Sequence, residues 1–258
     1  MVRSIRSGVA LLFLGVSLCV TPVKSEEPTW LDLWGEVLAR HTRAVDSEVG
    51  TRVDYVALSR DPMWPRVLAG LGKQDPLRFK TREEKLSFWI NAYNILAIDV
   101  VIQNYPVKSI RDIGSWFRPV WKKPAGQIRG RSYSLDEIEH EILRPMGEPR
   151  IHGAIVCASI SCPSLLRRPY RAQSVGAQMD ESLRAWMRRP DKGMALDRQN
   201  RILRVSKVFD WFSEDFEVEG GVRSFVTRYA PPEAAAWLRE EKEPVSLRYF
   251  DYDWNLNN

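Results

Sequence analysis

Cysteine and histidine are scarce in this chain, which limits the chemistry that its side chains offer. Three cysteines and three histidines occur among 258 residues, so a thiol or imidazole site must be built from very few groups. The sequence also has no glycine-rich phosphate loop, no Gly-x-Ser-x-Gly turn, no His-Glu-x-x-His helix and no Cys-x-x-Cys motif. Without these motifs, any site has to be argued from individual residues.

Long apolar runs are confined to the amino-terminal end. Two arginines precede the apolar segment 9–20, which is too short for a comfortable membrane span. Residues 23–25 then place small side chains at the positions that a signal peptidase reads. We therefore expect residues 1–25 to be a cleaved signal peptide, with a periplasmic or secreted mature protein and no transmembrane span. A lipoprotein signal at Cys19 and an uncleaved anchor are the alternatives.

Neither positive nor negative charge is in large excess once the expected signal peptide, the leader, is set aside. The whole chain has 38 basic and 33 acidic side chains, a net charge of +5. The leader holds three of the basic residues and no acidic ones, so 35 basic and 33 acidic residues remain. A balance this even does not indicate a phosphate-binding surface, and we expect no nucleic-acid partner.

Residues 150–165, RIHGAIVCASISCPSL, form the stretch around which the chemistry is concentrated. The apolar run 151–157 predicts a buried strand, with a piece of buried helix as the alternative, and the polar residues after it predict a turn. His152 and the two remaining cysteines are therefore close in the chain. Cys157 and Cys162 could form a disulfide only if a tight turn brought their Cα atoms within about 7 Å. Because we expect the mature protein in an oxidising compartment, a disulfide remains an alternative to two free thiols.

The longest predicted helix runs from about residue 82 to residue 104. The pattern Thr81–Glu84 has the spacing of a capping box, and the helix is apolar almost all the way round, as is typical of a helix in the middle of a domain. Asn91 and Asn94 share one narrow polar line on it. A buried amide must be hydrogen-bonded, so these two side chains either tether the backbone of a neighbouring loop or line a pocket.

A second capping box, Ser134–Glu137, predicts a helix that Pro145 ends. Glu139 falls close to the apolar stripe of this helix, so we expect a buried, paired carboxylate there. His140 lies off the stripe, and its side chain faces either solvent or another element.

Residues 110–131 are rich in tryptophan, proline and glycine and predict a long ordered loop. Its aromatic residues include Trp116 and Trp121, which are candidates for facing a ligand or a peptide.

The other segments predict a mixture of helices and short strands. Proline and glycine break up residues 62–72, and His41 near the end of the first helix is expected to be exposed to solvent. The expected helices are 29–44, 172–188, 222–229 and 233–238, with a short helix after Ser206, a hairpin of 194–196 with 202–205, and a last strand at 245–252. We predict one α+β domain over 26–258, in which the central buried helix packs against a small mixed or antiparallel sheet.

Five segments together resemble the domain-of-unknown-function 547 family. They are 88–94 (FWINAYN), 138–144 (IEHEILR), 152–163, 206–216 and 252–257 (YDWNLN). The resemblance implies a compact domain that is often exported in bacteria, and it implies no particular activity. Ala158 departs from the family, in which glycine is common after the first cysteine.

Three functional interpretations compete. The first is a cysteine-dependent hydrolase or acyl-transfer enzyme acting on peptide or amide substrates, which needs a thiolate, an imidazole and a polar group. The candidate catalytic residues are Cys162, Cys157, His152 and His140, with binding contributed by Asn91, Asn94, Glu139 and Trp116. Strand residues five apart point to opposite faces, so we expect the loop residue Cys162 to be the more accessible thiol.

The second interpretation is a non-catalytic envelope domain for binding or scaffolding, with structural cysteines and an unknown small-molecule or peptide ligand. The third is a redox or metal role. His152, Cys157 and Cys162 do not have the usual spacing of zinc ligands, and we expect neither a metal nor a cofactor.

Overall fold

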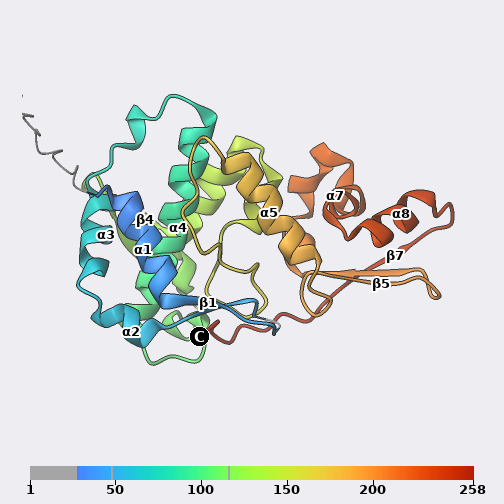
Figure 1. The fold of residues 1–258 in the computed structure, drawn as a ribbon, viewed down its shortest axis with the longest axis horizontal. Coiled ribbons are helices and arrows are strands. Elements are labelled where there is room, and N and C mark those ends of the chain that lie inside the picture. The colour runs from blue at the N-terminus through green and yellow to red at the C-terminus, as the bar shows by residue number, and fades with distance from the viewer. Residues whose placement is uncertain (1–27, 48, 116) are drawn as a thin grey trace, which may run out of the picture.

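The fold is built around one long helix that is buried along most of its length (Figure 1). The computed structural model describes residues 28–258 except 48 and 116, so the expected signal peptide lies outside the described residues. Helix α4 (Arg82–Asn104) has the predicted bounds, and the capping box between Thr81 and Glu84 is formed. Every residue from Leu86 to Val101 is buried. By length and composition α4 could cross a membrane, but 83 % of its apolar window is buried within the fold, as in the core helix of a domain.

The amino-terminal third of the chain covers α4 with three shorter helices. They are α1 (Trp30–His41), α2 (Tyr55–Arg60) and α3 (Met63–Gly72), followed by the 3₁₀ turn η1 (Pro76–Arg78). The predicted helix 29–44 ends earlier because its last residues pair as a strand. The prediction that residues 62–72 are broken up was wrong, since Pro65 lies in the first turn of α3, where proline is tolerated.

In the described part of the chain, seven short strands form three separate sheets. β1 (Thr42–Ala44) with β2 (Thr51–Val53) and β3 (Pro124–Ile128) with β4 (Arg131–Ser134) are antiparallel pairs. The third sheet has the order β5–β6–β7, from Met194–Asp197, Ile202–Val205 and Ser246–Tyr249. In it β5 is antiparallel and β7 parallel to β6. These mixed and antiparallel strands, with α4 packed against β3, confirm the α+β class. The strands stay in separate sheets because most pairs are local hairpins.

Two predicted segments have a different structure. Residues 110–131 are not one loop: they hold the 3₁₀ turns η2 (Ile110–Ile113) and η3 (Val120–Lys122) and then strand β3. The predicted strand 151–157 was wrong, because Pro149–Gly153 form a 3₁₀ turn, η6, that continues into an irregular chain. This run is buried on all sides, and a fully buried apolar run carries no periodicity that separates strand from helix.

The rest of the chain follows the expectation closely. The elements are η4 (Glu137–Leu143, a π-helix), η5 (Arg144–Met146), α5 (Val175–Met187), α6 (Val208–Trp211), η7 (Ser213–Glu219), α7 (Gly221–Tyr229) and α8 (Pro232–Glu240). The hairpin β5–β6 and the last strand β7 lie where they were predicted.

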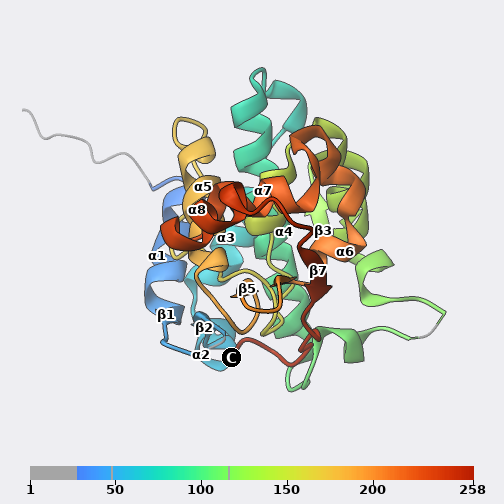
Figure 2. The ribbon, with the colours of Figure 1, turned by 90° about the vertical axis from the view of Figure 1, so that its right-hand side faces the viewer.

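The buried side chains form two hydrophobic clusters, with α5 between them. Val175 and Met179 at the start of α5 belong to the cluster around α4, whereas Leu183 and Trp186 belong to the cluster of β6, α6, η7, α7 and α8. After β7 the chain returns to the first cluster and ends beside α2 and β1 (Figures 1 and 2). The candidate site lies where the two clusters meet.

Candidate functional site

Cys157 and Cys162 are joined by a disulfide, with their Cα atoms 6.4 Å apart. The turn between them requires one residue in the left-handed backbone conformation, and this residue is Ala158, with a φ of 64°. Glycine adopts this conformation at little cost, which explains why glycine suits this position. The Nζ atom of Lys192 donates hydrogen bonds to the carbonyl oxygens of Ile160 and Cys162 at 2.8 and 2.6 Å. The side chain of Lys192 therefore holds the far side of the turn in place.

The carboxyl-terminal segment 252–258 lies against the same turn. Backbone hydrogen bonds run from Ile160 N to Asn255 O at 2.8 Å and from Asn257 N to Ala158 O at 3.0 Å. The amide of Asp253 also donates to the Ser161 hydroxyl at 2.8 Å. These contacts fix the segment as a strap across the turn.

The strap places Tyr252 over the disulfide. The Tyr252 hydroxyl lies 3.2 Å from Cys162 Sγ and 3.5 Å from Cys157 Sγ. Cys162 Sγ also accepts a hydrogen bond from the Cys157 N–H at 3.1 Å. The Ser159 hydroxyl lies 3.2 Å from this sulfur and 3.1 Å from the Tyr252 oxygen, and it can donate its one proton to either. Burial raises the pKa of Tyr252, so its hydroxyl keeps its proton and can donate it. Three donors thus converge on one sulfur.

The exposure of the two sulfurs is the reverse of our expectation. Cys162 is only 3 % exposed, whereas Cys157 is half-buried. The prediction that Cys162 is the more accessible residue was wrong, because the turn folds Cys162 back beneath the strap.

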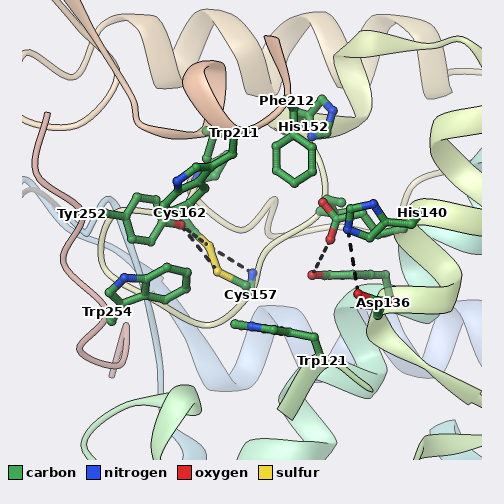
Figure 3. Close-up of a pocket in the computed structure, with 15 residues that line it drawn as sticks. Trp121, Asp136, His140, His152, Cys157, Cys162, Trp211, Phe212, Tyr252 and Trp254 are labelled. Carbon is green, nitrogen blue, oxygen red and sulfur yellow. Dashed lines mark hydrogen bonds and ion pairs between the residues drawn. A yellow bond between two sulfur atoms is a disulfide. The ribbon is translucent and has the colours of Figure 1, made fainter. Parts of the chain in front are cut away.

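A cavity of about 200 Å³ opens beside the disulfide. Figure 3 shows the two sulfurs with Trp211, Tyr252 and Trp254 on one side and with His140 and Asp136 on the other. The aromatic side chains that line the cavity are Tyr93, Trp121, Trp211, Phe212, Tyr252 and Trp254. The site is therefore a small aromatic cavity with a disulfide in its wall and ionisable groups facing it.

Glu139 is one of these ionisable groups. Its carboxylate accepts a hydrogen bond from the Tyr93 hydroxyl of α4 at 3.2 Å, so it is paired as predicted, although Glu139 is half-buried and not fully buried. Burial raises the pKa of Glu139 to about 7, against the opposing effects of the Tyr93 hydrogen bond and the charge of Arg144. A carboxyl group with this pKa can accept or release a proton near neutral pH.

His140 faces the same cavity and is partly open to solvent. Its ring packs against Phe212 with centroids 5.8 Å apart, and its Nδ1 lies 2.8 Å from a guanidinium nitrogen of Arg144. Sequence periodicity at 100° per residue separated His140 from Glu139, but η4 is a π-helix, whose wider turn changes which residues share a face. Both side chains reach the cavity for this reason.

His152 lies behind Phe212 and pairs with Asp215. Its Nε2 is 2.7 Å from Asp215 Oδ2, and Arg144 binds both oxygens of the same carboxylate, at 2.7 and 2.8 Å. Burial opposes the charge of Asp215, but the hydrogen bonds from His152 and Arg144 outweigh it and hold the pKa of Asp215 well below its usual range. Burial lowers the pKa of His152. A neutral His152 must therefore carry its proton on Nε2 and donate it to the carboxylate.

Neither Arg144 nor Asp215 was among the predicted site residues. Both stand in segments on which the family resemblance was based, 138–144 and 206–216, and that position is the signal that could have identified them. Among the described residues, no hydrogen bond joins an imidazole to either sulfur. His152 lines the same cavity as the two cysteines, whereas Asp215 is not among the described residues that line it.

The amides of Asn91 and Asn94 tether backbone, which was one of the two alternatives for them. Asn91 Nδ2 donates to Tyr170 O at 2.7 Å, and its Oδ1 accepts from Tyr170 N at 3.1 Å. Asn94 Nδ2 donates to Ala154 O at 3.0 Å, and its Oδ1 accepts from Val156 N at 2.8 Å. Within the described chain these amides are not among the groups that line the cavity. Asn94 instead holds the segment that leads into Cys157.

Two remaining predictions concern His41 and the tryptophans of residues 110–131. His41 is not solvent-exposed as expected: its Nε2 lies 2.6 Å from Asp61 Oδ2, and 12 % of its side chain is exposed. Trp121 lines the cavity, whereas Trp116 lies outside the described residues. In the part of the chain that the structure describes, no group of three or more His, Cys, Asp or Glu side chains could hold a metal ion.

Comparison with known proteins gives a family match. The model of a family described as "Protein of unknown function, DUF547" matches residues 77–187. No curated protein and no solved structure matches the chain. The matched segment contains α4, the π-helix with Glu139, His152 and both cysteines of the disulfide. Over this segment, which supplies most of the candidate site, the chain resembles the DUF547 family.

Proposed function

We propose that this cavity carries out thiol–disulfide exchange. Cys157 is the sulfur that an external thiolate attacks, and Cys162 is the sulfur that leaves. The observation that carries the proposal is the convergence of three hydrogen-bond donors on Cys162 Sγ, while Cys157 is the half-buried partner beside the cavity. Donors around a sulfur stabilise its thiolate, and a more stable thiolate is a better leaving group.

The exchange proceeds in two balanced steps. The thiolate of an incoming thiol attacks Cys157 Sγ, and the electron pair of the Cys157–Cys162 bond passes to Cys162 Sγ, giving a mixed disulfide and a Cys162 thiolate. A second external thiolate then attacks the sulfur of the bound thiol and releases Cys157. Two external thiols become one disulfide, and the protein disulfide becomes two thiols.

Glu139 is suited to the proton transfers in this scheme. Its carboxyl faces the same cavity, and its pKa of about 7 makes both protonation states available at neutral pH. Glu139 accepts the proton of the incoming thiol and later returns it to the Cys162 thiolate. His152 is already hydrogen-bonded to Asp215 and stacks on Phe212. It therefore positions η7 and Phe212 beside the cavity and does not act as the base.

We also propose that the protein is exported. A periplasmic or secreted location, which follows if residues 1–25 are a signal peptide, would provide an oxidising compartment and thiol-containing partners. Intact-mass measurement of exported protein should show a chain that begins near Glu26. Retention of residues 1–25 in that material would contradict this part.

Trapping of the mixed disulfide tests the mechanism. In Cys162→Ser, an aromatic disulfide reagent should form a stable mixed disulfide at Cys157, detected by mass spectrometry. In Cys157→Ser, labelling of the buried Cys162 should be at least about tenfold slower, because burial of a thiol limits reagent access. Reduction of wild-type protein by 2-mercaptoethanol should also be faster in the folded protein than in urea. Equal labelling of both variants, together with slower reduction when folded, would reject exchange.

A cysteine-dependent hydrolase or acyl-transfer enzyme acting on peptide or amide substrates is the second candidate. The specific observation in its favour is that reduction would leave the Cys157 thiol beside a cavity that also holds a carboxyl of pKa about 7. Turnover of esters or amides by reduced protein alone, abolished in Cys157→Ser, would favour this function. If neither exchange nor turnover occurs, the alternative is a binding domain with structural cysteines.

A further inference from the structure

A second hollow continues outward from the disulfide cavity. It measures about 950 Å³ and is lined by η2, η3 and their connection, together with Trp121, Trp211 and Trp254. The same three tryptophans line the disulfide cavity. The two hollows therefore adjoin at these tryptophans, and together they are called the groove below. In Figure 2 residues 108–115 and 117–123 project from the body of the fold beside the carboxyl-terminal segment.

The outer hollow is lined by a cation, Arg111, and an anion, Asp112, and the segment 108–123 that supplies most of its lining is rich in basic residues. Arg111 is exposed and lies over the ring of Trp254, with 5.1 Å between its guanidinium carbon and the ring centroid. Within the described residues no ion pair involves this guanidinium. The carboxylate of its neighbour Asp112 lines the same hollow and accepts a hydrogen bond from Ser109 N at 3.0 Å. The segment 108–123 contains the basic residues Lys108, Arg111, Arg118, Lys122 and Lys123 against the single acidic residue Asp112.

We propose that the groove binds an extended acidic peptide segment and presents a cysteine of that segment to Cys157. This inference rests on the proposed exchange function and names its substrate class. A small thiol would fill little of the groove, whose outer part alone is as large as the upper range of drug-sized pockets, about 300–1,000 Å³. Tryptophan faces offer broad apolar contact to a peptide chain. A guanidinium held over such a face suits a carboxylate, since charged hydrogen bonds of this kind are strong and directional.

The substrate class is tested by comparing the rates at which matched cysteine peptides form a mixed disulfide with the protein. Three blocked hexapeptides would each carry one cysteine and differ only at two positions, as Glu, Gln or Lys, with 2-mercaptoethanol as the small thiol. The measured quantity is the second-order rate constant for formation of the mixed disulfide with oxidised protein. The acidic peptide should react on the order of tenfold faster than the lysine peptide at low salt, and added salt should reduce this preference.

Substitutions in the groove test whether it causes the preference for the acidic peptide. Arg111→Ala should lower the ratio of the acidic-peptide rate to the mercaptoethanol rate by about fivefold to tenfold, and Arg111→Lys should restore part of it. Arg60→Ala is the control, because Arg60 is exposed on α2 and lies outside both hollows. Trp211→Ala should slow all three peptides, since it removes a wall that both hollows share.

The outcomes separate this inference from the exchange function. If mercaptoethanol and every peptide fail to form a mixed disulfide, exchange itself is rejected. If mercaptoethanol reacts but the three peptides react equally, or if Arg111→Ala leaves the ratio unchanged, exchange stands and the acidic-peptide groove is rejected. A mercaptoethanol rate above the rates of all the peptides would indicate a small-thiol substrate.

Discussion

The hydroxyl of Tyr252 lies 3.2 Å from the sulfur of Cys162, although 90 residues separate the two in the chain. The contact exists because the carboxyl-terminal strap hydrogen-bonds across the cysteine turn. It makes the last residues of the chain part of a site whose other groups come from the middle of the sequence.

Tyr252→Phe removes this hydroxyl and keeps the ring that packs between Trp211 and Trp254. We expect the exchange rate to fall by up to about fivefold, because the Cys162 thiolate loses a donor worth about 1 kcal/mol. Stability should fall by no more than about 1 kcal/mol. Stopped-flow rates of thiol exchange and urea unfolding measure the two effects. Tyr249→Phe in β7 is the matched control, and an equal loss of rate in both variants would contradict the role of Tyr252.

Glu139→Gln should change the dependence of stability on pH. The folded protein holds this proton up to a pKa of about 7, whereas the unfolded chain loses it near pH 4.3. As pH rises between these values the unfolded state binds fewer protons than the folded state, so wild-type stability falls. The glutamine variant lacks this loss and should gain about 2 kcal/mol relative to wild type from pH 4.5 to pH 8, after allowance for partial exposure.

Urea unfolding of both proteins across that pH range measures the gain. Glu141→Gln, an exposed position in the same helix, should follow the wild-type dependence. A difference between wild type and Glu139→Gln that stays constant with pH would show that the carboxyl is not held protonated by the fold.

Asp215→Asn breaks the pairing with His152 and Arg144. We expect a loss of about 2–3 kcal/mol at pH 7, because a partly buried guanidinium is left without its carboxylate. The pKa of Asp215 is held low in the folded state, so its contribution is fully present above about pH 4 and is lost as pH falls towards the folded pKa. The difference between the two proteins should therefore shrink below pH 4. Unfolding curves at pH 7, 4 and 3 measure it.

Asp210→Asn is the control for this effect. Asp210 pairs with Lys207 at the surface with about two-fifths of each side chain exposed, and such pairs contribute little. A loss as large as that of Asp215→Asn would argue against a special role for the buried pair.

Ala158→Gly should stabilise the protein. Ala158 has a φ of 64°, a conformation that costs a residue with a Cβ atom about 1 kcal/mol. Allowing for the greater freedom of glycine in the unfolded chain, we expect a gain of about 0.5 kcal/mol. Ala154→Gly is the control, since Ala154 is equally buried but has a φ of −116°. That variant should lose stability, and a loss at position 158 as well would contradict the strain argument.

Local sequence patterns determined much of the fold. The bounds of α4 follow from the Thr81 capping box and from the near-continuous apolar residues that a central helix requires. The hairpin of β5 and β6 and the helices α5, α7 and α8 follow from periodicity in the same way. The pairing of Glu139 was predictable because an acidic residue near an apolar stripe needs a partner.

The site itself was decided by tertiary structure. The disulfide depends on Ala158 adopting a left-handed conformation, and the order of exposure of the two sulfurs depends on a strap from the end of the chain. His140 joins Glu139 at the cavity only because η4 is a π-helix, a wider turn than the sequence periodicity assumes. Asp215 reaches His152 across 63 residues. The sequence identifies the reactive side chains that are present. Which of them lie together is decided by contacts between distant segments, because these contacts arise only when the whole chain packs.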